Sequence, residues 1–449
     1  MQLKVRWAIG IVVLAGYAAG ASGQISLTSA VDLALRNDPR VKMSEAAVQK
    51  AQASLDETRD VYVPSVSANV GYGQGSGVPT GLPTLFSISG DSLLFNFSQR
   101  DNIRSAASGL ASAKLMLKDA TDQVEEDVVM AYLNLDSDER SESAMKDEYG
   151  FATRLVSIVQ DRLDAGQDTR MELLHAQRAA KLIELQQLQM EDEIAILSDR
   201  LSRTIGLPTA QLNAVPESIP PLPSLHAAVG RDDESDSFAV QAALAGAKGK
   251  QEFAFGVSRY RLRPQLSLDL NYTRIDTAQN SYTTYYPGFT GKSENAFSAG
   301  IQLTLPIYDR RHQDQANEAI AEANRAHFEA EDERNQFLEG RFKLRHSALE
   351  LSAHSDLAEI DRDLAHEQLN VVLAQESAGS ASTGAIQMTP KDEEKARIDE
   401  SARTIDLLNA QFQVSQAEVN LLRQNGRLDE WLKTALLKES SVAMPIVSH

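Results

Sequence analysis

Four carboxylates stand at the starts of two segments of helical character. Asp168 and Glu172 come shortly after a turn at Gly166, and Asp392 and Glu393 begin a similar segment near the C-terminal end. Acidic side chains in the first turn of a helix interact favourably with the helix macrodipole, by ~0.3–1 kcal/mol each. Where symmetry copies of a carboxylate surround an axis, they bind cations and favour cation passage. Helix stabilisation alone explains these residues, so any further role depends on the elements that position them.

The other reactive side chains form no recognisable catalytic or metal-binding arrangement. No nucleophile, base and orienting group recur at a consistent spacing, and no histidine belongs to a His-x-x-x-His or His-Glu-x-x-His pattern. A glycine-rich stretch over 71–77 follows a strand but leads into prolines instead of a helix, which favours a hairpin tip over a phosphate-binding loop. We therefore predict no catalytic residue, cofactor or metal, and no enzymatic activity.

The first two carboxylates follow a very long helical pattern, over residues 98–165. Its first half has the four-and-three spacing of a coiled-coil seam, at positions 103, 107, 110, 114, 117, 121, 124, 128, 131 and 135. The seam lapses from Asp136 to Ser143, where no residue is apolar, and then resumes. At ~1.5 Å per residue the helix would be on the order of 100 Å long. It must therefore lie against other helices of similar length.

The composition excludes several classes of protein. The 449 residues include no cysteine, which removes disulfides, thiolate metal sites and a lipidated N-terminal cysteine. The formal net charge of −19 argues against a nucleic-acid partner. Residues 1–23 have the basic start, apolar run and small-residue end of a signal peptide. No later stretch approaches ~18 consecutive apolar residues, so any entry into a membrane must be made by strands.

Two β-hairpins are predicted, over 64–97 and 264–305. Their strands alternate apolar and polar residues, and a change of phase near residues 90–92 predicts a bulge there. Strands of this kind suit an outer-membrane barrel, although a soluble sheet buried on one face fits them about equally well. No further apolar layer remains to cover the sheet. Because four strands cannot close a barrel in lipid, several chains must contribute strands to one barrel.

The order of elements occurs twice, which predicts an internal duplication. The first repeat, 24–225, has a helix over 29–60, the hairpin 64–97, the long helix 98–165 and a return helix 170–205. The second repeat, 226–432, has a helix, the hairpin 264–305, the long helix 309–376 and a return helix 390–425, and a tail over 433–449 follows.

Several helix ends and connections are predicted from single residues. Thr28 is the expected N-cap of the first helix, and Pro39 should kink or restart that helix. Thr169 and Thr389 are the expected N-caps of the return helices, with Pro390 at the first helical position of the second. Four prolines between positions 216 and 223 indicate a linker that runs to about residue 237.

The combined order of these elements resembles the TolC-like outer-membrane efflux proteins. The resemblance covers Ser26 to about Trp431 and also rests on short stretches, namely Ser26-Leu-Thr-Ser-Ala-Val-Asp-Leu-Ala-Leu-Arg-Asn-Asp-Pro39, Leu163-Asp-Ala-Gly166 with Leu174-His-Ala-Gln177, and Leu303-Thr-Leu-Pro-Ile-Tyr-Asp309. It implies a mainly α-helical fold with a β-barrel portion. In that fold a homotrimer builds a twelve-stranded outer-membrane barrel, four strands per chain, and a hollow coiled-coil cylinder that crosses the periplasm.

The resemblance also implies a function and partners. The protein would be the passive exit duct of a tripartite efflux or type I secretion system, carrying small molecules or proteins across the periplasm and the outer membrane. Its partners would be a periplasmic adaptor, an inner-membrane pump and outer-membrane lipid. The return turns would form the periplasmic tip, where acidic side chains narrow the pore. By position, Asp392 is the ring residue, Glu172 is its first-half match, and Asp168 and Glu393 are close neighbours.

The chain departs from the family pattern at two places. Asp309-Arg310-Arg311 stands where the family often has Asp-Gly-Gly, and the second turn, 380–388, carries seven extra residues. A soluble periplasmic coiled-coil adaptor is the alternative function, but adaptors need a lipoyl-like or β-barrel module between helices, and no such segment is present. An exported hydrolase is disfavoured because no catalytic constellation is found.

Overall fold

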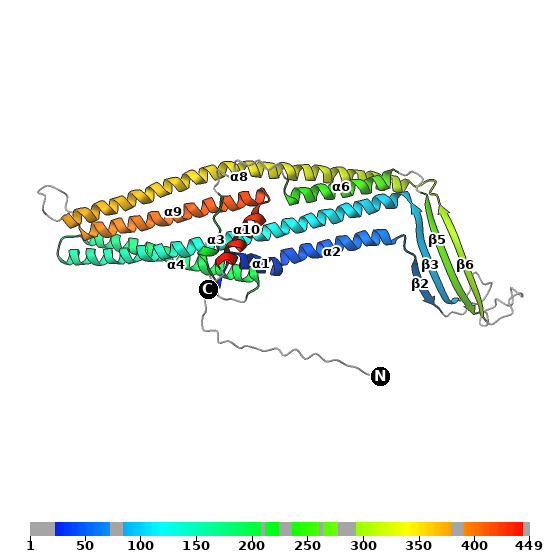
Figure 1. Cartoon of the computed structure of the whole chain (residues 1–449), viewed down its shortest axis with the longest axis horizontal. Helices are drawn as coiled ribbons and strands as arrows, with labels where there is room; N and C mark the ends of the chain where they lie inside the picture. The colour runs from blue at the N-terminus through cyan, green and yellow to red at the C-terminus, as the bar shows by residue number, and fades with distance from the viewer. Residues whose placement is uncertain are drawn as a thin grey trace, which may run out of the picture.

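The computed structural model describes residues 23–71, 84–207, 212–223, 236–259, 264–276, 293–378 and 389–442. Within these ranges long helices lie side by side, with an antiparallel sheet at one end (Figure 1). The predicted signal peptide lies outside the described residues apart from Gly23, and so does the enlarged second turn, 380–388. In the described ranges, no helix has both the length and the apolar character that crossing a membrane would need.

Two very long helices form the frame of the molecule. They are α3, Phe97–Asp164, with 68 residues, and α8, Arg310–Ala378, with 69 residues. Four shorter helices lie alongside them: α2, Pro39–Asp60; α4, Arg170–Ile205; α6, Phe238–Ser258; and α9, Pro390–Gln424. Helix α3 packs against all four, and α8 packs against α6 and α9. In Figure 1, α9 and α6 lie end to end between α3 and α8. Helix α3 therefore contacts helices from both halves of the chain.

Local interactions define both ends of α3, one beside the sheet and the other at the opposite end of the molecule. It begins where the Asn96 side chain accepts a hydrogen bond from the Ser98 backbone N–H, at 2.9 Å. It ends at Gly166, whose φ of +74° lets the chain reverse, so that the Gln167 N–H reaches the Arg162 carbonyl at 2.8 Å. Between these points the apolar seam keeps one side of the helix buried.

The helix predicted over 29–60 is two helices, α1, Leu27–Asn37, and α2. The predicted restart at Pro39 is confirmed, because Asp38 caps α2 by accepting a bond from the Arg40 N–H at 2.7 Å. The N-cap predicted at Thr28 is wrong. Ser26 is the cap, and Thr28 lies inside the helix with its side chain buried.

A compact cluster near the middle of the long axis brings together the first described residues and the last described helix. Strand β1, Gly23–Ile25, pairs in parallel with β4, Leu212–Ala214, and the 3₁₀ turn η1, Pro216–Ser218, follows. Helix α10, Leu428–Val442, packs beside them, so the boundary expected at residue 433 falls inside a helix. The predicted linker begins at Pro216, and its first described part, 216–223, starts with η1 and packs in this cluster. Its prolines exclude an α-helix.

The phenol of Tyr132 on α3 is the centre of this cluster. Its ring is fully buried, its O–H donates to the Ile25 carbonyl at 2.8 Å, and its oxygen accepts from the Val215 N–H at 2.7 Å. Ser218 Oγ lies 3.0 Å from the same oxygen and accepts from the Leu27 N–H at 3.1 Å. One side chain thus joins the long helix to β1 and to the residue that follows β4.

The sheet contains β2, Ser65–Val70; β3, Thr84–Asn96; β5, Gln265–Asp276; and β6, Ser293–Thr304. Its order is β2-β3-β5-β6, and all neighbours are antiparallel. The cross-strand register puts the apolar residues on one face, namely Val66, Ala68, Val70, Phe86, Ile88, Leu266, Leu268, Leu270, Tyr272, Phe297, Ala299, Ile301 and Leu303. This face is bare: Val70 is 82% exposed and Phe297 is 72% exposed.

The bulge in β3 lies further along the strand than the sequence predicts. Residues 90–92 pair regularly with β5, and the register shifts between Leu93 and Phe95. Strand β2 begins opposite Asp91, so beyond this point the loop that precedes β2 lies beside β3. There the Leu93 N–H donates to the Val61 carbonyl at 3.2 Å, and Ser92 Oγ donates to the Tyr62 carbonyl at 2.9 Å. The irregularity follows the loss of the neighbouring strand.

Candidate gate at the helical tip

The tip is the end of the molecule opposite the sheet, where α3 turns into α4 and α9 begins beside them (Figure 1). Helices α3 and α4 form one helical hairpin, and α8 and α9 form the other. Thr169 caps α4 as predicted, since its Oγ1 accepts from the Glu172 N–H at 3.2 Å. This cap fixes the turn that presents Asp168 toward the second hairpin.

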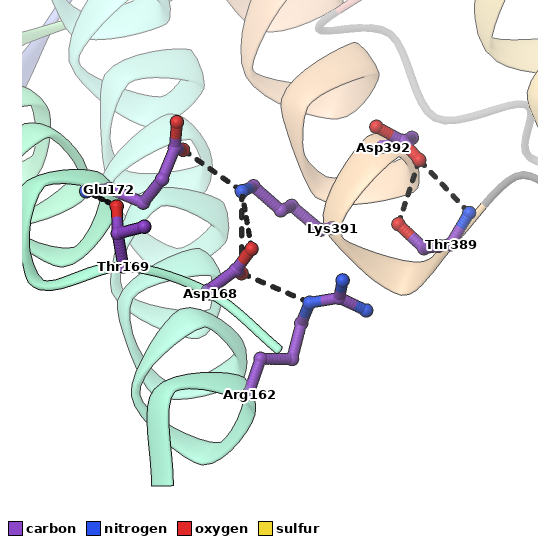
Figure 2. A network of polar contacts seen from close by, with 7 residues as sticks. All are labelled: Arg162, Asp168, Thr169, Glu172, Thr389, Lys391 and Asp392. Carbon is purple, nitrogen blue, oxygen red and sulfur yellow. Dashed lines mark hydrogen bonds and ion pairs between the residues drawn. The ribbon is translucent and has the colours of Figure 1, made fainter. Parts of the chain in front are cut away.

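Lys391 of α9 joins the two hairpins. Its Nζ donates to Glu172 Oε2 at 2.9 Å and lies 3.3 Å from Asp168 Oδ2 (Figure 2). Arg162 of α3 donates from Nε to the same Asp168 oxygen at 3.0 Å. The Lys391 and Asp168 side chains are only 12% and 11% exposed. The structure therefore brings together two of the four predicted site residues, Asp168 and Glu172, around a cation from the other half of the chain.

The pKa directions agree with a network in which every member is charged. Burial acts to raise the pKa of Asp168, but the bonds from Arg162 and Lys391 outweigh it and lower that pKa. The bond from Lys391 likewise lowers the pKa of Glu172. Burial acts to lower the pKa of Lys391, and the two carboxylates raise it instead. The lysine stays protonated and both acids stay ionised at neutral pH.

The other two predicted residues, Asp392 and Glu393, have partners within the second hairpin. Asp392 Oδ2 accepts from the Thr389 N–H at 3.0 Å and from Thr389 Oγ1 at 2.7 Å (Figure 2). Thr389 is thus the N-cap residue and Pro390 the first residue of α9, as predicted. Glu393 accepts from Arg397 Nη2 at 2.6 Å. Within one chain, the bonds of Asp392 to Thr389 cap the N-terminus of α9.

Sequence reasoning missed Lys391 and Arg162. One signal was available for Lys391, because a cation in the first turn of a helix opposes the macrodipole and calls for a compensating partner. The identity of that partner was not readable, since Asp168 lies 223 residues away. Arg162 had no distinguishing signal in the last turn of α3, where a basic residue is favourable in any case.

The tip can hold and release an electrostatic link, and the described side chains offer no sign of other chemistry there. Within the described ranges, no group of three or more histidine, aspartate or glutamate residues could hold a metal ion. The network instead connects the two hairpins, which also meet where Arg154 of α3 lies 3.9 Å from Glu394 of α9. Breaking it would free the start of α9 from the turn between α3 and α4.

Comparison with known proteins supports the sequence resemblance. The model of the outer membrane efflux protein family matches residues 30–207. Protein CyaE of Bordetella pertussis is 25% identical over 315 residues, which is 67% of this chain and spans 65% of the length of that relative.

Solved structures of outer-membrane channels share the fold. CmeC of Campylobacter jejuni has a TM-score of 0.71 at 15% identity, covering 98% of each chain. The outer membrane protein VceC of Vibrio cholerae has a TM-score of 0.68 at 16% identity, covering 89% of this chain and 96% of its own. The open state of the Neisseria gonorrhoeae channel MtrE has a TM-score of 0.67 at 16% identity, covering 90% and 89%.

These findings confirm the predicted fold class, a mainly α-helical channel fold with a β-barrel portion to which this chain contributes four strands. The internal duplication and the number of chains in the barrel stay predictions. The family whose model matches is one of channel proteins and not of enzymes. The chain is thus similar to outer membrane efflux proteins over residues 30–207, and it shares its fold with solved outer-membrane channels.

Proposed function

We propose that three copies of this chain form a passive exit duct that carries small molecules or proteins through the periplasm and the outer membrane. The bare apolar face of the four-stranded sheet carries this proposal. Its opposite face is polar, as expected for strands that have lipid on one side and a water-filled lumen on the other. Edge strands β2 and β6 pair with no further strand in the described residues, so copies can join edge to edge and close a barrel.

Exposed apolar side chains on the helices support assembly of the same copies. Rows of them run along α4 and α8, namely Met171, Leu174, Leu182, Leu185, Leu188 and Ile196 on the first, and Phe328, Phe342, Leu357, Ile360 and Leu364 on the second. Apolar rows of this length on a water-facing bundle favour burial against another chain. Copies that pair through their sheets would bring such rows together.

The tip network is the proposed gate of the duct. At rest, Lys391 would hold the second hairpin against Asp168 and Glu172, and opening would separate the hairpins. The structure of the neighbouring channel MtrE is of its open state, which supports a channel of this fold that can open. The energy for export, and the force that opens the tip, would come from a periplasmic adaptor and an inner-membrane pump. A soluble adaptor role has no comparable support, because it leaves the apolar sheet face without a covering.

Purified mature protein in a planar bilayer tests the proposed function. We expect single-channel current steps, and a particle in detergent with the mass of three chains. A water-soluble monomer that gives no current, including when the tip is opened by substitution, would contradict the proposal. The current would show that a barrel has closed, and the mass would give the number of chains in it, because four strands alone cannot close a barrel in lipid.

Asp392 is proposed to form a cation-binding ring when three chains assemble. Asp392→Lys should lower the affinity of a divalent cation that blocks the pore by about tenfold or more, since tenfold corresponds to only ~1.4 kcal/mol. Asp392→Asn is the matched control, because an asparagine oxygen can still accept from Thr389 and so preserves the cap. Titration of block in planar bilayers should rank wild type first, Asp392→Asn second and Asp392→Lys last. Equal block in all three proteins would remove Asp392 from the pore.

A further inference from the structure

Glu148 is a buried carboxyl in the seam between the two hairpins. On α3 the seam is formed by Met145, Ala152, Leu155 and Val159, which contact Ile398 and Ile405 of α9 and the facing side chains of α4. Glu148 has the same four-and-three spacing and is 7% exposed, so it occupies a core position of an otherwise apolar contact. A polar residue at such a position costs stability and is kept where it gives specificity or a switch.

Glu148 has no cation to neutralise it. Within the described residues its carboxyl forms no ion pair and no hydrogen bond, and the charged group that acts on it is Asp406 of α9. Burial first, and then the negative charge of Asp406, raises the pKa of Glu148 to about 7. The carboxyl is therefore close to half protonated in the neutral range.

The neighbouring charged groups are already paired with one another. On α9, Asp406 accepts from Arg403 Nη1 at 3.2 Å. On α4, Glu184 accepts from Lys181 at 2.6 Å and from the Tyr149 hydroxyl at 3.2 Å. One turn earlier on α3, Lys146 pairs with Glu142 at 2.5 Å. None of these cations pairs with Glu148. Protonation of its carboxyl therefore removes a charge that would be costly to bury.

Two similar carboxyls on α3 do not lie between the hairpins. Asp138 faces Glu193 of α4, which belongs to the same hairpin, and Glu125 faces Asp429 of α10 at the central cluster. Glu148 differs because separating the hairpins would expose it to water. Its protonation can thus distinguish a closed tip from an open one.

We propose that Glu148 is a proton-sensitive bolt between α3 and α9, which holds the hairpins together when protonated and favours their separation when ionised. The inference rests on the proposed function, because opening of the duct is what would part this seam. The direction follows from linkage: the closed form, with the higher proton affinity, is most favoured at low pH and loses this advantage as pH rises toward about 7. The change is at most about tenfold in the closed-to-open ratio per pH unit for each chain.

Planar-bilayer recording between pH 5 and pH 8 tests the bolt. In the wild type the open fraction should rise with pH. Glu148→Gln, a neutral side chain of the same shape, should keep the low open fraction at every pH. Asp147→Asn, an exposed neighbour on the same helix, should behave as the wild type. A Glu148→Gln channel with the wild-type pH response would overturn the proposal.

A distance measurement separates this inference from the proposed function. The chain has no native cysteine, so spin labels can be attached at Ser143→Cys on α3 and Asn409→Cys on α9, both exposed positions. We expect the label distances to lengthen or broaden as pH rises, and Glu148→Gln to abolish the change. Distances that do not respond to pH would refute the bolt even in a conducting channel. A clear response in a protein without conductance would refute the duct alone.

Discussion

Reversing the charge at Lys391 should give a channel that stays open without its partners. A glutamate at this position repels Asp168 and Glu172, the two carboxylates that the lysine now binds at 3.3 Å and 2.9 Å. The substitution replaces two attractive contacts by two repulsive ones, so the open-to-closed ratio should rise by about tenfold or more. Single-channel recording at neutral pH measures this ratio directly.

Two further variants show whether the effect belongs to the network. Lys395→Glu makes the same charge change at an exposed position one turn along α9. Because the charge of Lys395 acts on Glu172 without a hydrogen bond, this variant should raise the open fraction much less than Lys391→Glu does. Combining Lys391→Glu with Asp168→Lys restores a pair of opposite charges and should recover part of the closure. If all three proteins are as closed as the wild type, the tip network is not the gate.

Removing one hydroxyl at Tyr132 should destabilise the protein more than any other change of a single oxygen atom in the central cluster. Tyr132→Phe keeps the ring in place but leaves the Val215 N–H and the Ile25 carbonyl with one partner fewer. A buried polar group without its partner costs ~1–3 kcal/mol, and two such groups are affected here. Thermal unfolding of the helices in detergent, followed by circular dichroism, should shift to lower temperature by several degrees.

The control for this prediction is Tyr308→Phe, which removes the same atom from a side chain that is 85% exposed. Its unfolding temperature should match that of the wild type, because this hydroxyl makes no hydrogen bond to the described residues. Equal stability of Tyr132→Phe and Tyr308→Phe would mean that the strands and turn of the cluster are held by apolar contacts alone.

The sequence predicts those parts of the fold that are determined by local periodicity. The four-and-three spacing of α3, the alternation in the strands, Gly166 at the turn and Thr169 before α4 each depend on residues close together in the chain. Strands β1 and β4 escaped prediction because three residues are too few to show a period. The bulge was misplaced because its position depends on where the neighbouring strand ends.

The candidate site was predictable only as a set of acidic helix starts. That Asp168 and Glu172 bind Lys391, whereas Asp392 binds its own cap, depends on how two distant segments pack at the tip. Glu148 shows the same limit. Its spacing places it in the seam, but a glutamate in a heptad pattern is expected to be exposed to solvent unless the facing helix is known.

The continuity of α3 makes it a lever arm. From Tyr132, held in the central cluster, the helix runs without a break to Asp164 at the tip, a length of roughly 50 Å at ~1.5 Å per residue. A tilt of about 5° about the cluster would displace the tip by roughly 4 Å, more than a hydrogen bond can stretch. Small rotations near the cluster therefore suffice to part Lys391 from its carboxylates, so a force applied there could open the proposed gate without any contact at the tip.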